Sequence, residues 1–241
     1  MRLPIIQGLI RRRILVNYRV DPQVASRQLP ARFRPKLQAG QAVAGICLIR
    51  LEQLRPKLLP EVVGLKSENV AHRVAVLWED EEGATREGVF IPRRDTDSQM
   101  ARLVGGRLFP GEHHRASFSI SESESEISFK MKSQDEEVAV ELRAKVADEL
   151  PPSSIFQSLQ EASRFFESGS LGYSVTREPG RLDGLTLKTE EWRVEPLEVN
   201  DLYSSYFADR SRFPEGSVEF DHALMMRDIA HEWHVASELY V

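Results

Sequence analysis

The sequence predicts an α+β fold built mainly from antiparallel strands, as a curled sheet or β-barrel with a few short helices and a central cavity. Apolar and polar residues alternate in many segments, and a period of two is typical of half-buried strands. Helical spacing is confined to short stretches. Closing a large antiparallel sheet removes its edges and often leaves a ligand cavity.

The N-terminal part predicts a strand followed by a short helix. Residues 14–20 form the first expected strand. Asp21 then caps a helix that begins at Pro22, because an aspartate side chain accepts a backbone hydrogen bond there and the missing N–H of proline costs nothing. This helix is expected to stop near Leu29 and Pro30, since the residue before a proline avoids helical backbone.

Strands are also predicted through the rest of the chain. The clearest is 138–146, where a period of two persists despite helix-forming residues between the apolar ones. The segment 220–227 fits a strand or a helix equally well. The other expected strands, including a hairpin around the charged turn 79–83, are 43–51, 70–78, 88–91, 116–120, 127–131, 171–177 and 184–192.

Two further helices are predicted from their caps. The first follows the hairpin and ends at a pair of glycines. The second has apolar residues at helical spacing between 155 and 166. The expected caps and ends are Asp95 or Asp97 with Gly105, and Ser153 or Ser154 with Gly169.

Composition favours one globular domain, 1–241. Of the 241 residues, 41% are hydrophobic and 29% are charged, which is ordinary for such a protein. Strand patterns on both sides of Pro151 and Pro152 argue against a domain boundary there. The net charge of −5 gives no reason to expect a nucleic-acid partner.

Cysteine and hydropathy patterns predict a cytoplasmic protein with no membrane partner. Cys47 is the one cysteine, so no internal disulfide can form, and its apolar surroundings suggest a small core residue. No segment approaches the roughly 18 apolar residues of a membrane span. The apolar stretch 3–10 precedes the three arginines 11–13, the reverse of the order in a signal peptide.

Three segments resemble acetoacetate decarboxylases, in the order found in that family. They are the Arg-rich strand and Tyr-Arg-Val-Asp-Pro of 11–22, the Ser-Glu-Asn-Val of 67–70, and the segment from Ala-Arg to Phe-Pro at 101–110. The whole chain is most similar to an uncharacterised branch of that superfamily, the YqjF-like proteins. Features of the second half that carry this resemblance are Phe165-Phe166-Glu167, Tyr173-Ser174 and Trp192.

The chain departs from the decarboxylases where their chemistry is done. The family places two lysines after the aromatic-Pro step, and one of them forms a Schiff base with the ketone. Here Gly111 and Glu112 follow Pro110, so no amine is available at this place. The nearest other groups are His113 and His114. Lysines 130 and 132 alternate with apolar residues and are expected on the solvent face.

The resemblance implies roles for two matching residues. Arg11 takes the place of an arginine that faces the pocket and would bind a carboxylate, although it could equally be one of three exposed arginines. Glu68 takes the place of a glutamate that moves protons at the reacting carbon, or else pairs with Arg73 or Arg102 as a structural carboxylate. Asn69 would hold Glu68 or cap a strand end.

No cofactor or metal is expected. His231 and His234 are three residues apart, so they could converge on a helix but would point to opposite faces of a strand. The histidines are therefore more simply explained as hydrogen-bonding groups near the surface.

Three functional hypotheses remain open. The first is a protein that binds a small carboxylate or oxo compound without Schiff-base chemistry. The second is a lyase, hydratase or isomerase with Glu68 as general acid/base, and the third is a structural or interaction protein with a vestigial cavity. Sheet edges in such domains often pair, so a homodimer is one allowed state. The candidate catalytic residues are Glu68, His113 and His114, and the candidate binding residues are Arg11, Asn69, Arg102, Pro110 and Gly111.

Overall fold

The computed structural model describes residues 5–60, 64–98 and 111–241, most of which lie in strands of one sheet. The described helices are α1 (Pro22–Arg27), α3 (Leu159–Ser168) and α4 (Ser205–Ala208). The described strands are β1 (Ile6–Val20), β2 (Arg34–Pro35), β3 (Leu37–Gln38), β4 (Gln41–Pro56), β5 (Leu65–Glu79), β6 (Thr85–Thr96), β7 (His114–Glu122), β8 (Glu126–Ser133), β9 (Ala139–Val146), β10 (Leu171–Val175), β11 (Arg181–Thr189), β12 (Glu195–Ser204) and β13 (Val218–Tyr240).

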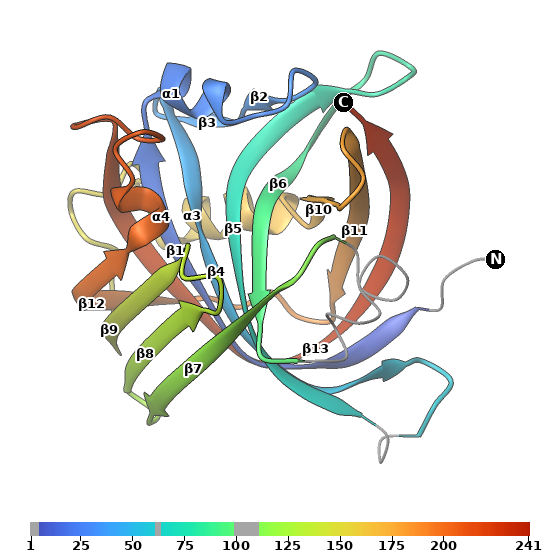
Figure 1. Cartoon of the computed structure of the whole chain (residues 1–241). Coiled ribbons are helices and arrows are strands. Elements are labelled where there is room, and N and C mark those ends of the chain that lie inside the picture. The colour runs from blue at the N-terminus through green and yellow to red at the C-terminus, as the bar shows by residue number, and fades with distance from the viewer. Residues whose placement is uncertain (1–4, 61–63, 99–110) are drawn as a thin grey trace.

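Hydrogen bonding closes the sheet into two rings that share a wall (Figure 1). The shared wall consists of β13, β1, β4, β5 and β6. The first ring is completed by β10, which pairs with β6, and β11, which pairs with β13. The second ring is completed by β7, β8, β9 and β12, which run from β6 back to β13. Among the described pairs only β6–β10 and β6–β7 are parallel, so the predicted α+β fold of mainly antiparallel strands is confirmed.

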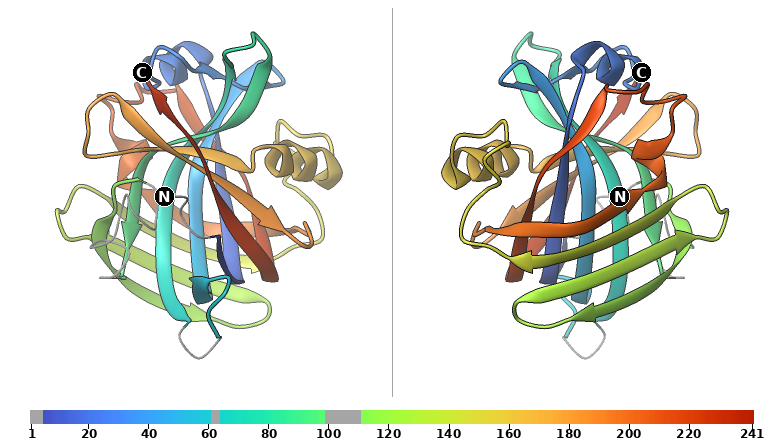
Figure 2. Two further views of the ribbon diagram at one scale, coloured as in Figure 1. Left: turned by 90° about the vertical axis from the view of Figure 1, so that its right-hand side faces the viewer. Right: turned by 90° about the vertical axis from the view of Figure 1, so that its left-hand side faces the viewer.

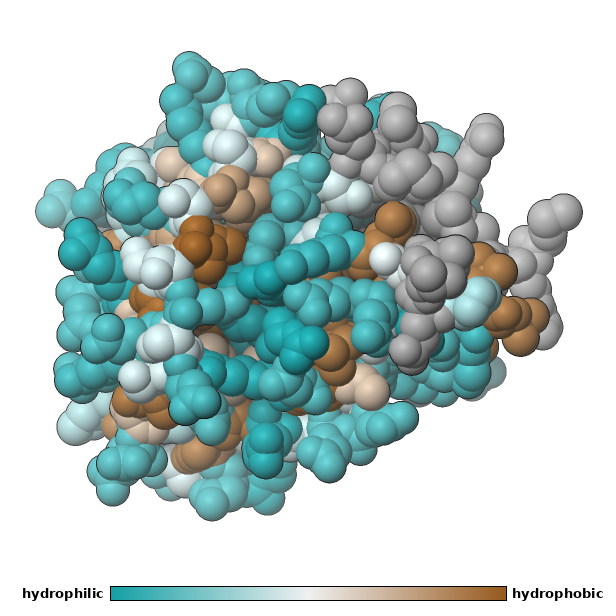
Figure 3. Space-filling model, turned by 90° about the horizontal axis from the view of Figure 1, so that it is seen from below, coloured by the Kyte–Doolittle hydropathy of each residue, from teal (hydrophilic) through white to brown (hydrophobic). Residues whose placement is uncertain are grey.

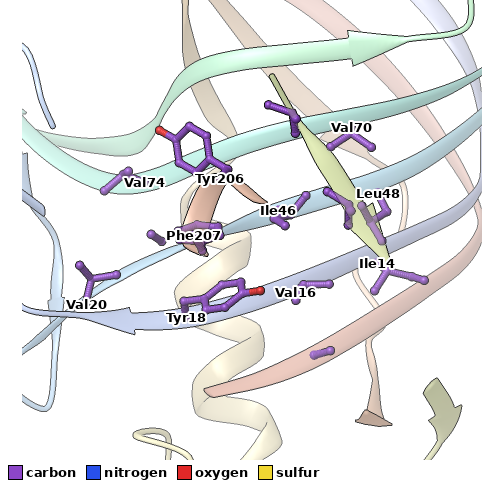
Figure 4. Packing of buried hydrophobic residues seen from close by; sticks show 14 of the residues in the cluster. Ile14, Val16, Tyr18, Val20, Ile46, Leu48, Val70, Val74, Tyr206 and Phe207 are labelled. Atoms are coloured by element: carbon purple, nitrogen blue, oxygen red, sulfur yellow. The ribbon is translucent and has the colours of Figure 1, made fainter. Parts of the chain in front are cut away.

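The shared wall is apolar on both faces because each face lines a different ring. Ile14, Leu48 and Val70 are register partners on β1, β4 and β5, and all three point into the second ring (Figure 4). Leu15 and Leu224 belong to a separate cluster that faces the first ring. Fully burying such a side chain contributes ~1.5–3 kcal/mol. A wall buried on both sides explains why β4 is almost continuously apolar in sequence.

The helices cover the ends of the rings. The expected cap of α1 is present, because the Asp21 carboxylate accepts from the backbone N–H groups of residues 23 and 24. Helix α3 packs against the first ring (Figure 2) and buries Phe165 and Phe166, which belong to the cluster that faces this ring. The predicted cap of α3 was wrong, since Ser158 caps it and Ser154 instead donates to the Asp221 carboxylate. Gly169 ends α3 as expected.

Two other local expectations differ from the structure or lie outside it. Asp95 lies within β6 and caps no helix, because β6 continues to Thr96 and pairs with both β5 and β7. The rest of the helix expected before Gly105 lies outside the described residues. The ambiguous segment 220–227 is strand, as part of the long β13. None of the described helices is long and apolar enough to cross a membrane.

Candidate functional site

A cavity of about 120 Å³ lies inside the first ring, against the shared wall. Its wall is hollow where β4 and β5 carry the small register partners Cys47 and Ala71. Its apolar lining includes Ile49, Leu51, Val89, Ile91, Phe166, Leu185, Leu187, Trp192 and Trp233. Its polar lining includes Arg13, Arg73, Arg94, His113, Ser67, Asn69, Ser98 and Asp95, whose carboxylate pairs with Arg93.

Arg13 enters the cavity from β1. Its Nε donates to the Cys47 sulfur at 3.4 Å, and its guanidinium carbon lies 5.5 Å from the centroid of the Trp192 ring. Its Nη1 lies 4.0 Å from the Met226 sulfur. Sulfur atoms are weak acceptors, so these contacts leave most of the donor capacity of Arg13 open to a ligand.

Arg73 enters from β5 and is only 5% exposed. It donates through Nη2 to the side-chain oxygen of Asn17 and lies over Phe166. Its Nε has no hydrogen-bond partner among the described residues. Burial, together with the nearby charge of Arg13, lowers the pKa of Arg73 to about 10. The side chain therefore remains positively charged at neutral pH.

Arg94 enters from β6, and its Nε donates to the Ser174 hydroxyl at 2.9 Å. Burial lowers the pKa of Arg94 to about 10, so it is also a cation at neutral pH. Within residues 5–60, 64–98 and 111–241, no ion pair joins Arg13, Arg73 or Arg94 to a carboxylate. The cavity thus holds three guanidinium groups whose described partners are all neutral.

His113 stands beside Arg94 in the cavity lining. Burial, and then the charge of Arg94, lower the pKa of His113 to about 3, so the ring is neutral. Its Nδ1 lies 3.3 Å from the Gly111 carbonyl, which favours the Nδ1–H tautomer and leaves Nε2 as an acceptor. Gly111 has a φ of +88°, and an added Cβ would lie 2.5 Å from the Ser174 Cβ, so this turn requires glycine.

Asn69 also lines the cavity and is held by neighbours on the same sheet. Its side-chain oxygen accepts from the Thr96 hydroxyl at 2.8 Å, and its Nδ2 donates to the Ser67 hydroxyl at 2.9 Å. Neither bond involves Glu68. Asn69 therefore presents a fixed amide to the cavity, although it does not hold Glu68 as the sequence suggested.

Arg11 lies outside the cavity, so the structure agrees with the alternative of an exposed arginine and not with the pocket-facing role that the resemblance implied. Its side chain is 43% exposed and pairs with Glu52 and Asp228. The pairing of β1 with β4 shifts register between Ile10 and Arg12, so Arg11 has no partner in the ladder. This bulge turns Arg11 outward, and Arg13 is the arginine of β1 that faces the cavity.

Glu68 lies on the other face of β5, toward the second ring. Its Oε2 lies 2.6 Å from the Nη2 of Arg12, which is 2% exposed. Burial raises the pKa of Glu68 above its ordinary value, with Arg12 and Arg50 opposing that shift. Glu68 is therefore paired with Arg12 and not with the expected Arg73, and it does not line the cavity.

The remaining sequence candidates are dispersed. His114 points away from the cavity, and its Nδ1 lies 3.1 Å from the Asp135 carboxylate. Arg102 and Pro110 lie outside the described residues. His231 and His234 lie on a strand, three residues apart, and therefore on opposite faces. No group of three or more His, Cys, Asp or Glu residues suited to a metal occurs in the part of the chain that the structure describes.

Sequence reasoning missed the three cavity arginines. One signal was present, because Arg73 alternates with Ala71 and Asn69, two residues that leave room beside it. A long cation among small residues inside a strand points to a cavity face. For Arg13 the sequence holds no comparable signal, since the choice between positions 11 and 13 depends on the bulge.

The sequence matches the model of a known protein family over most of its length. Residues 9–225 match DUF2071, a family described as an uncharacterized conserved protein. The chain belongs to the DUF2071 family. No curated protein matched the sequence. The predicted resemblance to the YqjF-like branch of the acetoacetate decarboxylase superfamily is thereby confirmed.

Solved structures extend the similarity of this DUF2071 protein to the whole fold. An acetoacetate decarboxylase-like enzyme from Sphingomonas wittichii is 11% identical, with a TM-score of 0.58 over 100% of this chain and 94% of that one. Acetoacetate decarboxylase from Legionella pneumophila is 14% identical, with a TM-score of 0.59 over 98% and 88%. The enduracididine biosynthesis enzyme MppR, complexed with pyruvate, is 11% identical, with a TM-score of 0.59 over 100% and 91%.

Proposed function

We propose that this DUF2071 protein binds a small carboxylate or oxo compound in the cavity of the first ring, without forming a Schiff base. The observation that carries the proposal is the set of three arginines with neutral partners around an apolar space. No lysine is among the cavity-lining residues in the described part of the chain. Recognition would therefore rest on charge and hydrogen bonds and not on covalent capture.

Electrostatics favours an anionic ligand. Like charges in a cavity of low effective dielectric repel each other more strongly than in water. A bound carboxylate would offset that repulsion and would accept two hydrogen bonds from one guanidinium group. The ligand is small, because a comparable engineered cavity of ~150 Å³ holds one benzene molecule. MppR, which shares the fold, has been solved with pyruvate, and this supports a small oxo acid as the first ligand to test.

The proposal is tested by calorimetric titration of the full chain with pyruvate and other short oxo acids. Replacing Arg94 by glutamine should weaken binding at least tenfold, because it removes a charge from the cavity. The parallel variant Arg11→Gln should leave affinity within twofold, since Arg11 pairs with Glu52 and Asp228 outside the cavity. Loss of binding in Arg11→Gln but not in Arg94→Gln would restore the sequence-based assignment and reject this one.

A second candidate is a lyase, hydratase or isomerase in the same cavity, with His113 as the proton-transfer group. Its neutral ring in the cavity lining is the observation in favour, because a bound carboxylate would offset the charge of Arg94 and raise the lowered pKa of His113 toward the range that a general base requires. Any turnover of a bound oxo acid should then be lost in His113→Gln with binding retained. Turnover that depends on Glu68 instead would contradict this role.

A purely structural or interaction role is less well supported. The lower face of the molecule is mostly hydrophilic, with hydrophobic residues in separate patches (Figure 3). That face offers no broad apolar surface to a partner chain. Failure of every small acid and oxo compound to bind would favour this third hypothesis, in which the homodimer that the sheet edges allow is the first state to test.

A further inference from the structure

The three cavity arginines occupy different levels of the first ring. Residues that pair laterally across neighbouring strands form a row of the sheet. Arg13 lies in the same row as Asn69, and Arg94 lies in the same row as Ala71, two residues further along β5. Arg73 lies two residues further along β5. Because each residue of a strand advances ~3.3 Å, the outer rows are about 13 Å apart at the backbone. The backbone positions are therefore spread along the wall, and the contacts of each guanidinium group decide which charges lie together.

The arginines divide into a pair and a single residue. Arg73 extends across β4 to donate to Asn17 on β1, and Arg13 donates to Cys47 on β4, so both guanidinium groups lie on the β1 and β4 side of the wall. Arg94 is held by Ser174 and stands beside His113. The cavity thus has two cationic ends, one on the β1 and β4 side and one on the β6 side.

Neutral groups hold each end in place without cancelling its charge. Arg73 donates to Asn17, and Asn17 donates at 3.0 Å to Nε2 of His222. His222 in turn lies 2.6 Å through Nδ1 from the Asp221 carboxylate. All three bonds run in one direction with a single tautomer of His222. These three hydrogen bonds position Arg73 and place the Asp221 carboxylate beyond Asn17 and His222, so that it does not pair with Arg73.

Apolar side chains occupy the cavity wall between and around the cationic ends. Ile49, Ile91 and Leu187 lie there, and Cys47 and Ala71 leave the space open. A single carboxylate could satisfy one end and would leave the other charged and desolvated. A short apolar chain with an acidic group at each end matches both the charge distribution and the apolar wall.

We propose that the ligand of this cavity is a small dianion, with one acidic group bound by Arg94 and the other by Arg13 and Arg73. This inference rests on the proposed function and narrows it from carboxylates and oxo compounds in general to molecules with two acidic ends. In the simplest case both acidic groups are carboxylates on a chain of about two to four carbons, given the ~150 Å³ of a cavity that holds benzene.

The test is calorimetric titration of the full chain with matched acids at constant ionic strength. Succinate, glutarate and adipate are compared with butyrate, which has one acidic end, and with succinamide, which has none. We expect the best dicarboxylate to bind at least tenfold more tightly than butyrate, which corresponds to about 1.4 kcal/mol. Succinamide should bind more weakly than either.

The variant Arg94→Gln separates charge from packing. It should reduce the preference for dicarboxylate over butyrate to less than threefold, because one cationic end is lost. If the wild-type protein bound butyrate and the dicarboxylates with equal affinity, the proposal of a dianionic ligand would be wrong, whereas the proposed binding of carboxylates would still hold. If none of these acids and no oxo acid bound, both the dianion proposal and the proposed function would be wrong. A dicarboxylate preference that survives in Arg94→Gln would also reject the assignment of the two ends.

Discussion

The two rings treat buried arginines in opposite ways. In the second ring, Arg12 pairs with Glu68 and Glu122, and Arg93 pairs with Asp95 and with two carboxylates from the loop after β8. In the first ring, the cavity arginines contact thiol, thioether, amide and hydroxyl groups. The same residue type is thus neutralised within the fold on one side of the shared wall and left with its charge on the other.

This difference separates a structural use of arginine from a binding use. A buried pair that loses one partner leaves an uncompensated charge, so the paired arginines of the second ring hold the fold together. An arginine with neutral partners raises the energy of the empty protein, and an anionic ligand lowers it again. Variants that move an arginine from one class to the other therefore test the comparison directly.

The largest expected effect is in the second ring. Arg12→Leu should lower the free energy of unfolding by about 3 kcal/mol, because Glu68 would remain largely buried with only Arg50 as its cation, and that cation is shared with the more exposed Glu122. Urea denaturation at neutral pH measures the change.

The first-ring counterpart is Arg94→Met, which removes a charge that has no described ionic partner. It should leave the free energy of unfolding unchanged or raise it by about 1 kcal/mol, since hydrophobic replacement of a buried charge is often stabilising. A loss as large as that of Arg12→Leu would show that both rings use arginine structurally and would remove the basis of the comparison.

A second effect depends on pH and concerns His72, which is fully buried on the second-ring side and lies against Tyr206. Burial, with smaller effects from Arg93 and Arg212, lowers the pKa of His72 to about 3. The unfolded chain therefore binds this proton first as pH falls, so stability is lost progressively from about pH 6.5 toward pH 3. His72→Phe should remove about 2 kcal/mol of the loss between pH 6.5 and 5.

The measurement is the free energy of unfolding at several pH values in that window. His72 makes no hydrogen bond with the described residues, so phenylalanine breaks none there. Phe207→Leu, at a buried neighbour of His72 that does not titrate, should lower stability equally at every pH and serves as the control. An identical acid loss in wild type and His72→Phe would show that other groups bind the protons.

The smallest expected effect converts a first-ring arginine into a paired one. Asn17→Asp places a carboxylate against Arg73, where the native amide oxygen accepts now. Affinity for an acidic ligand should fall about fivefold, which is about 1 kcal/mol. Stability should fall as well, because aspartate lacks the amide donor that bonds His222 and the Leu15 carbonyl. Calorimetric titration measures the change in affinity, and an unaltered affinity would show that Arg73 does not contact the ligand.

Much of this architecture could be predicted because it depends on local patterns. The Asp21 cap, the hairpin of β5 and β6 and the period-two strand β9 all follow from residues that are neighbours in sequence. The start of α3 was misplaced because three nearby serines can each cap, and the Ser154 hydroxyl is used by Asp221, which is distant in sequence. A tertiary contact therefore determines which of the three serines caps α3, and the local sequence could not.

The candidate site was less predictable for the same reason. The family resemblance drew attention to Arg11 and Glu68, whereas one bulge in β1 and the alternation of β5 decide which side chains face the first ring. His113 and Asn69 line the cavity, as the sequence suggested for a site. A one-residue shift in a strand exchanges its two faces, so motif matching alone cannot distinguish a cavity residue from its neighbour.

The position of β13 has a consequence for how the protein is made. This last strand pairs with β1, β11 and β12, so both rings close through it. Ile6 pairs with Trp233, and contacts between such distant residues form slowly because a long loop must close first. During synthesis the edge of β1 that awaits β13 remains open until residues 218–240 have left the ribosome. The cavity therefore assembles only after β13 has emerged, and the nascent chain before that point is the stage most exposed to aggregation.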